Sequence, residues 1–158
     1  MGLRVLYCNS DIDTRSSDNL SSHNSTLTLG GLDSIKLDSI VGLLSLQSDY
    51  DVIGIDEAQF FENLKEIVLE LVENLDKKVI ISGLNGDSFR KPFGEILDLI
   101  PYSDKILKLH PFCKICCQKY DILNKAIFSK RIVDNQEIII VGAQDMFIPV
   151  CRKCYLEK

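Results

Sequence analysis

Two Cys-x-x-Cys pairs are the most specific chemical feature of this chain: Cys113 with Cys116, and Cys151 with Cys154. Two such pairs supply four thiolates for tetrahedral coordination, which is what a structural zinc site requires. The alternatives are two disulfides or four buried thiols. A disulfide within a Cys-x-x-Cys pair is usually strained, and nothing else in the sequence indicates an oxidising compartment. We therefore expect a structural Zn²⁺ that ties together the ends of the intervening segment.

Two adjacent acids, Asp56 and Glu57, end a continuous apolar run that begins after Asp51. In open α/β sheets the ligand crevice lies at the carboxyl ends of the strands. An acid at that edge can hold Mg²⁺ near phosphates, and a second acid can take a proton from an attacking hydroxyl. The alternative is that both are acids at the entrance of a helix, and the spacing alone favours neither interpretation.

Aromatic side chains follow two successive predicted strands. Aromatic residues in consecutive strand-to-helix loops can enclose a flat ring, although packing in the core explains the same pattern. The residues are Phe60 and Phe61 after the first of these strands, and Phe89 and Phe93 after the second.

Further polar residues are expected near the same edge. Gln59 can hydrogen-bond the edge of a base or cap the following helix, and Arg90 with Lys91 can neutralise a phosphate or form a solvated charge pair. Arg15 can contact a phosphate with Asp13 orienting it, and the alternative for this segment is an Asx-type turn. These residues are candidates for the phosphate side of a binding site.

Alternating strands and helices must position these residues. The apolar patterns predict strands at 4–8, 51–57, 78–84 and 105–110, and helices at 33–46, 64–75 and 94–100. This alternation indicates a parallel sheet with helices on its faces. After residue 110, paired strands at 126–132 and 137–141 are expected between the cysteine pairs. We therefore predict an α/β domain over 1–110 and a small zinc-bound β lobe over 111–158.

The bulk properties exclude some classes of protein. The chain has 158 residues, a formal net charge of −5 and a pI near 5.0, which argues against a protein that coats duplex nucleic acid. No apolar run reaches the roughly 18 residues of a membrane span, and we expect no signal peptide. A reducing cytosol or nucleus fits free thiols that hold metal, and we expect a cytoplasmic location.

Taken together, the motifs resemble those of the type II thymidine kinases, the zinc-containing cytosolic and viral class. The stretch 52–61 (VIGIDEAQFF) is similar to the family's V-I-G-I-D-E-[AG]-Q-F-F, and 83–94 (GLNGDSFRKPFG) to its LDG-x-F-x-R-K-P-F-G. Shorter matches are 13–15 (DTR), 22–24 (SHN) and 129–131 (SKR), and 141–155 resembles the family's terminal lasso and second zinc knuckle. The resemblance covers essentially the whole chain.

The resemblance implies a fold and a reaction. The fold would be a parallel sheet of the P-loop-kinase type with a C-terminal zinc lobe and a lasso loop. The reaction would be the ATP-dependent phosphorylation of thymidine or deoxyuridine, giving dTMP for DNA precursor salvage, with Mg²⁺ bound to ATP. The protein would be a homo-oligomer, a tetramer by resemblance.

The resemblance also implies roles for individual residues. Glu57 would be the general base on the deoxyribose 5′-hydroxyl, Asp56 would act on Mg²⁺ through water, and Arg15 with Asp13 would support the phosphate region. The zinc would be architectural, with no open coordination position. Phe60, Leu84 and Phe93 would pack on the thymine, and Ser129, Ile140, Gly142 and the lasso residue Phe147 would hold the base edge and sugar.

Departures from the family pattern define an alternative. The family begins with a strand, a G-x-x-x-x-G-K-[ST] phosphate loop and a helix, and these 158 residues hold no such motif. We therefore expect an N-terminally incomplete sheet. Asn85, Ser88 and Phe147 also differ from the family's usual residues. The alternative function is a non-catalytic nucleoside-binding pseudokinase or an oligomer partner.

Overall fold

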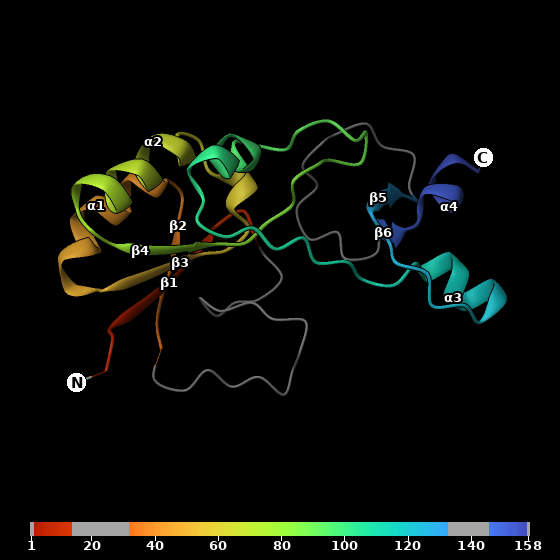
Figure 1. Cartoon of the computed structure of the whole chain (residues 1–158), viewed down its shortest axis with the longest axis horizontal. Coiled ribbons are helices and arrows are strands. Elements are labelled where there is room, and N and C mark those ends of the chain that lie inside the picture. Colours follow the sequence, from red (N-terminus) through yellow and green to blue (C-terminus); the bar gives the residue numbers. More distant parts are fainter. Residues whose placement is uncertain (1, 14–31, 133–145, 158) are drawn as a thin grey trace. The chain divides into compact units, whose positions relative to one another are not determined.

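The computed structural model describes residues 2–13, 32–132 and 146–157, and its packing divides the chain into two compact units (Figure 1). The first unit comprises Met1–Asn85 and Phe93–Pro101, and the second comprises Gly86–Pro92 and Tyr102–Lys158. The predicted domain boundary at residue 110 stays a prediction. Among the described residues, no helix has the length and apolar character needed to cross a membrane.

The first unit contains a four-stranded parallel sheet with the order β2-β1-β3-β4. The strands are β1 (Val5–Ser10), β2 (Asp33–Leu37), β3 (Val52–Ile55) and β4 (Lys78–Ile81). The register aligns Leu6 with Ile53, and Ile53 with Val79. The predicted α/β class with a parallel sheet is confirmed, because each described pairing in this sheet is parallel.

Helical segments lie on one side of this sheet in the described part of the chain (Figure 1). They are α1 (Leu43–Leu46), α2 (Leu64–Leu69), which continues as a π-helical segment (Glu70–Asn74), and a 3-10 segment (Ile96–Tyr102). Shorter 3-10 turns occur at Ile40–Gly42, Gln47–Asp49 and Ala58–Phe60. The buried core joins apolar residues of these helices to alternate residues of β1 and β3: Leu6, Cys8, Ile53 and Ile55 from the strands, and Ile40, Leu43, Leu64, Ile67 and Leu71 from the helices.

The predicted helix at 33–46 is wrong in its first part. Asp33–Leu37 forms β2, which pairs in parallel with Leu6–Ser10 of β1, and the α-helix begins only at Leu43. Ile35 and Leu37 also alternate with polar residues, a period-2 pattern that suits a strand. Pairing with the neighbouring strand therefore outweighed the weaker helical spacing.

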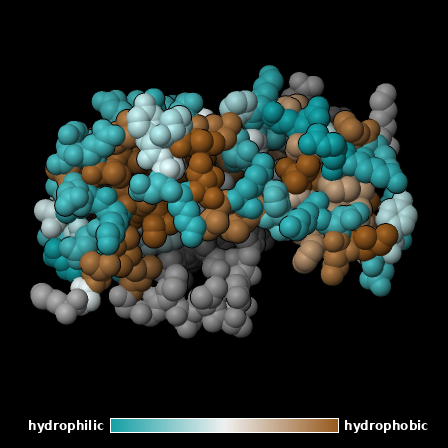
Figure 2. Space-filling model, in the orientation of Figure 1, coloured by the Kyte–Doolittle hydropathy of each residue, from teal (hydrophilic) through white to brown (hydrophobic). Residues whose placement is uncertain are grey.

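The predicted strand at 105–110 is also wrong. The segment has no regular secondary structure, and Ile106, Leu107 and Leu109 are 56%, 71% and 85% exposed. A strand needs a hydrogen-bonded neighbour, and none of the described strands pairs with this segment. Figure 2 shows hydrophobic residues exposed among the hydrophilic residues on the surface.

The second unit contains a small antiparallel sheet and two short helices. The elements are α3 (Lys114–Tyr120), β5 (Phe128–Arg131), β6 (Phe147–Val150) and α4 (Arg152–Leu156), and β5 pairs with β6. The strand predicted at 126–132 is confirmed, but its predicted partner at 137–141 lies outside the described residues. The sequence did not predict β6 or either helix. The core consists of Ala126, Val150 and three of the four paired cysteines.

Candidate active site and metal-binding cluster

Asp56 lies at the carboxyl edge of the sheet, directly after β3. Its backbone N–H donates to the carbonyl oxygen of Cys8 over 2.8 Å. Its carboxylate accepts a hydrogen bond of 2.6 Å from the hydroxyl of Tyr7 on β1 and one of 2.5 Å from the hydroxyl of Ser82, directly after β4. Hydroxyl groups from β1 and from the residue after β4 therefore fix this carboxylate at the edge where parallel sheets bind ligands.

Glu57 adopts a backbone conformation that non-glycine residues rarely occupy. Its φ is +48°, in the left-handed region, where the steric cost is about 1–2 kcal/mol. The side-chain amide of Gln59 donates to its carboxylate over 2.6 Å. Such conformations concentrate at functional sites, and here the side chain is partly exposed. Glu57 is thus an oriented carboxylate that can accept a proton.

Gln59 connects Glu57 to the segment that follows β4. It is 4% exposed, and its side-chain oxygen accepts a hydrogen bond of 2.9 Å from the backbone N–H of Leu84. A Cβ at Gly94, whose φ is +58°, would lie 2.4 Å from the carbonyl oxygen of Gln59, and one at Gly83 would lie 2.5 Å from its side-chain oxygen. Position 94 therefore requires glycine, whereas a side chain at position 83 would have to displace the side chain of Gln59. The side-chain amide of Gln59 therefore bonds to Glu57 and Leu84, and it does not cap the following helix, as one of its two predicted roles required.

An aromatic pair lies beside these residues in the first unit. The rings of Phe60 and Phe93 meet edge to face, with their centroids 5.6 Å apart and an angle of 87°. Leu84, which also belongs to the first unit, is 47% exposed. Phe61, by contrast, is 3% exposed and belongs to the core. Core packing, one of the two predicted interpretations, therefore applies to Phe61. Phe60 and Phe93 are only partly buried, so enclosure of a flat ring stays a prediction for them.

The end of β1 carries a buried polar network. Asn9 is fully buried, and its side-chain amide donates to the carboxylate of Asp13 over 2.9 Å. The ammonium group of Lys36 donates to the carbonyl oxygen of Asp13 over 2.7 Å. These hydrogen bonds fix the position of Asp13 relative to the end of β1. Arg15, the predicted phosphate ligand, lies outside the described residues.

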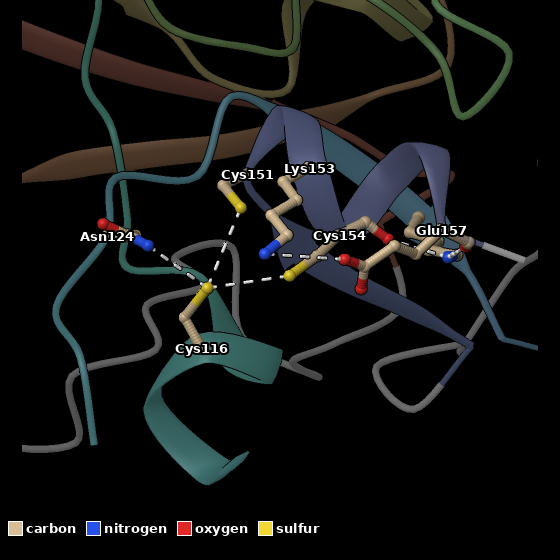
Figure 3. A network of polar contacts seen from close by, with 7 residues as sticks. Cys116, Asn124, Cys151, Lys153, Cys154 and Glu157 are labelled. Atoms are coloured by element: carbon tan, nitrogen blue, oxygen red, sulfur yellow. Dashed lines mark hydrogen bonds and ion pairs between the residues drawn. The ribbon is translucent and has the colours of Figure 1, made fainter. Parts of the chain in front are cut away.

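The four paired cysteines form one cluster in the second unit. All four sulfur atoms lie within 4.8 Å of one another, and Cys116 Sγ is 3.8 Å from that of Cys151 and 3.6 Å from that of Cys154 (Figure 3). Four thiolates at 2.3 Å from a central ion are separated by about 3.8 Å in a tetrahedron. The side-chain amide of Asn124 donates to Cys116 Sγ over 3.4 Å, a contact of the kind that supports metal ligands. The cluster can therefore hold a metal ion.

The thiols of this cluster differ in acidity. Burial opposes ionisation of Cys113, but hydrogen bonds from the backbone N–H groups of Cys151 and Cys116 outweigh it and lower the pKa of that thiol to about 7. Burial and the neighbouring cysteine thiols raise the pKa of Cys154 to about 12. Without a cation, the buried cluster thus resists full ionisation, and a bound divalent ion would stabilise all four thiolates.

The comparison with known proteins decides the family. The sequence model of the thymidine kinase family matches residues 1–155. This chain belongs to that family. Thymidine kinase of Choristoneura fumiferana entomopoxvirus is 36% identical over 148 residues, which cover 92% of this chain and 77% of the relative. Thymidine kinase of vaccinia virus (strain Western Reserve) is 40% identical over 125 residues, 79% of this chain and 67% of the relative.

The residues implied by the thymidine kinase resemblance fall into both units. Asp56, Glu57, Phe60, Leu84 and Phe93 belong to the first unit, where hydrogen bonds connect Glu57 through Gln59 to Leu84 and an edge-to-face contact joins Phe60 to Phe93. Ser129 and Phe147 belong to the second unit, on β5 and β6. Ile140 and Gly142 lie outside the described residues. The roles of all these residues stay predictions.

Tyr7 and Ser82 are contacts of the site that the sequence did not reveal. Tyr7 lies in an ordinary strand pattern, and Ser82 only ends the apolar run of β4. Their hydrogen bonds to Asp56 arise because β1 and β4 are the neighbours of β3. The strand order, which one sequence does not encode in any local motif, was the missing signal.

Proposed function

We propose that this protein phosphorylates the 5′-hydroxyl of thymidine or deoxyuridine with ATP, giving dTMP or dUMP for DNA precursor salvage. The observation that carries the proposal is the thymidine kinase match over residues 1–155. The oriented carboxylate of Glu57 near a partly buried aromatic pair supports it, because the reaction needs a proton acceptor and a surface for a flat base.

Glu57 would be the general base of this reaction. A phosphoryl acceptor loses its hydroxyl proton during transfer, and a carboxylate within hydrogen-bond reach can take it. The hydrogen bond from Gln59 orients the carboxylate of Glu57. The left-handed backbone at Glu57 supports this role, since strained residues are retained where they orient reacting groups.

Asp56 would hold the Mg²⁺ that accompanies ATP, through a water ligand. Two hydroxyl donors keep its carboxylate oriented. In other phosphoryl-transfer sites, the acid that follows a buried strand holds the magnesium ion. Mg²⁺ supplies charge neutralisation on the transferring phosphoryl group. Arg15 would contact phosphate, and Asp13 would support the chain that carries it.

The thymine ring would pack against Phe60, Leu84 and Phe93. The T-shaped aromatic pair and the exposed leucine offer an apolar surface in the first unit. The lasso of the second unit would hold the base edge and the sugar, largely through backbone groups. Its predicted members are Ser129, Ile140, Gly142 and Phe147.

Zn²⁺ would occupy the cysteine cluster as a structural ion. The sulfur spacing and the all-thiolate ligand set fit tetrahedral zinc, and four protein ligands leave no position for catalysis. The parallel sheet would be of the P-loop-kinase type, and the protein would work in the cytoplasm as a homo-oligomer, a tetramer by family resemblance.

A coupled assay of ADP release with thymidine and Mg-ATP tests the proposal. We expect turnover, and we expect Glu57→Gln to lower kcat by about 10²–10⁴-fold, because a positioned general base contributes that much. Glu62→Gln is the matched control, since Glu62 is an exposed acid a few residues away. Thymidine binding by calorimetry without turnover would instead support the non-catalytic nucleoside-binding role, and absence of both would refute the proposal.

A further inference from the structure

The net charge of −5 conceals opposite charges on the two units. By sequence, the first unit carries 6 lysines and arginines against 16 aspartates and glutamates, a net charge of −10. The second unit carries 12 against 7, a net charge of +5. The low pI therefore reflects the first unit alone. A basic unit within an acidic chain indicates interaction with an anionic partner such as nucleic acid.

The exposed aromatic rings of the described residues all belong to the basic second unit. They are Phe89, Tyr102, Phe112 and Tyr120, and they are 49% to 57% exposed. Each described aromatic residue of the first unit is buried or partly buried. An exposed ring offers a flat face on which the base of a single strand can stack.

Exposed cations accompany three of these four rings. Two pairs are adjacent in sequence, and an antiparallel bridge places the members of the third opposite each other. All three cations are exposed. The pairs are Phe89 with Arg90, Tyr120 with Lys119, and Phe112 with Lys125. Rings and cations side by side suit a strand in which bases and phosphates alternate.

Two arginines approach the same aromatic ring within the second unit. The guanidinium carbons of Arg90 and Arg152 lie 5.7 Å and 5.1 Å from the ring centroid of Phe128. The ring of Tyr155 lies 5.0 Å from that of Phe128 and 4.8 Å from the guanidinium carbon of Arg90. Both arginines are exposed, and no carboxylate or carbonyl oxygen of the described residues bonds to either guanidinium group.

This arrangement leaves both guanidinium groups able to bind an anion. A ring contacts the face of a guanidinium group, whereas the N–H donors lie in its plane and stay available for phosphate oxygens. The hydroxyl of Tyr155 donates to the carbonyl oxygen of Ser88 over 2.7 Å, so the ring is tied to the loop that carries Arg90. The loop and the rings therefore orient the donors before a ligand arrives.

We propose that the second unit binds single-stranded nucleic acid, with Arg90 and Arg152 contacting phosphates and Phe89 stacking on a base. The exposed rings favour a single strand over a duplex, in which the faces of the bases are already stacked. An acidic protein surface would use the cations but not the rings. This binding goes beyond the proposed function and does not depend on it.

Fluorescence anisotropy with a labelled, mixed-sequence single strand of about 20 nucleotides tests the proposal on the full chain. Excess thymidine is present throughout, so that the proposed nucleoside site is occupied. The competitors are the matching duplex, polyglutamate and phosphatidylserine vesicles, each at equal concentration of charge. We expect a Kd of about 1–100 μM at about 50 mM salt, rising with salt, and at least tenfold weaker competition by each competitor.

Charge and stacking variants separate the two kinds of contact. The double variant Arg90→Gln with Arg152→Gln should lower the slope of log affinity against log salt by about 1.4 and weaken binding about 25-fold at about 0.1 M salt, because each phosphate contact contributes about 0.7 to that slope. Arg90→Lys with Arg152→Lys keeps both charges and should keep the slope. Phe89→Leu should weaken binding about fivefold or more without changing the slope.

Lys78→Gln is the matched control, because Lys78 is an exposed cation of the first unit, and its affinity should stay within about twofold of the wild type. Zinc content and melting temperature show whether each variant is folded. No binding at about 50 mM salt would overturn the proposal, as would an equal loss in Lys78→Gln or an unchanged slope in the folded glutamine double variant. Equal competition by the duplex, by polyglutamate or by the vesicles would overturn it in favour of a general anionic partner.

The lysine double variant keeps the test decisive if the glutamine double variant does not fold. A folded lysine variant that lost the salt dependence would refute phosphate contacts at these two positions, because both charges remain.

Discussion

Replacing Cys154 by serine removes one of the four clustered sulfur atoms that could hold a metal ion in the second unit. Three of the five buried apolar residues in the core of that unit are cluster cysteines, and the others are Ala126 and Val150. Burial of a valine and an alanine contributes about 3 kcal/mol. Coordination by four ligands contributes about 10–16 kcal/mol in small zinc domains. A bound metal ion would therefore stabilise this unit more than these buried residues do, and we expect Cys154→Ser to unfold the second unit.

Hydrogen exchange with parallel metal analysis measures this effect. In Cys154→Ser, or after chelation, peptides covering β5 and β6 should exchange at the rate of unfolded chain, while those covering β1 and β3 should keep their protection. Cys117→Ser is the matched control, because Cys117 is adjacent to a ligand but outside the cluster, with its Sγ 3.7 Å from the carbonyl oxygen of Ile122. Persistent protection of β5 and β6 in metal-free protein would refute the reasoning, as would loss of metal from Cys117→Ser.

Three further substitutions test the first unit. Gly94→Ala should lower the free energy of unfolding by about 3 kcal/mol in urea titrations, from a left-handed φ and a backbone overlap, whereas Gly54→Ala, whose Cβ would meet only an atom at 3.8 Å, should stay within about 0.5 kcal/mol. Burial raises the pKa of Cys8 from 9.0 to about 12, so the folded state keeps a proton that the unfolded chain loses. The free energy of unfolding should therefore fall as pH rises from about 9 to 12. The fall per pH unit should be about 1.4 kcal/mol larger in the wild-type protein than in Cys8→Ala, and equal slopes in the two proteins would contradict this. Tyr7→Phe removes a donor to Asp56 and should raise the Mg²⁺ concentration for half-maximal turnover about tenfold, with the thymidine KM unchanged; an unchanged Mg²⁺ dependence would argue against the role of that carboxylate.

Local patterns predicted the elements in which one pattern of apolar residues persists. The apolar runs of β3 and β4 predicted strands and the apolar stripe of α2 predicted a helix, although Ile80 of β4 is 66% exposed. The segment Asp33–Leu37 carries two periods at once, and pairing with β1 decides between them. The run 105–110 has the composition of a strand, but composition cannot supply the neighbouring strand that hydrogen bonding needs.

The candidate sites likewise include features that the sequence predicted and contacts that it did not. The cysteine cluster follows from spacing, because four sulfurs in two short pairs have few other arrangements, and the structure brings them together. The contacts of Asp56 with Tyr7 and Ser82 depend on strand order, which no motif records. The contact between Arg90 and Tyr155 joins residues 65 positions apart and depends on the folding of both segments into one unit.

The left-handed backbone at Glu57 has a consequence for laboratory evolution of this protein. Glycine adopts that conformation without steric cost, so relief of the strain favours glycine at position 57. The same exchange deletes the proposed proton acceptor. A library selected only for heat resistance would thus accumulate inactive clones at this codon, and a screen that also scores dTMP formation is needed to retain the acid.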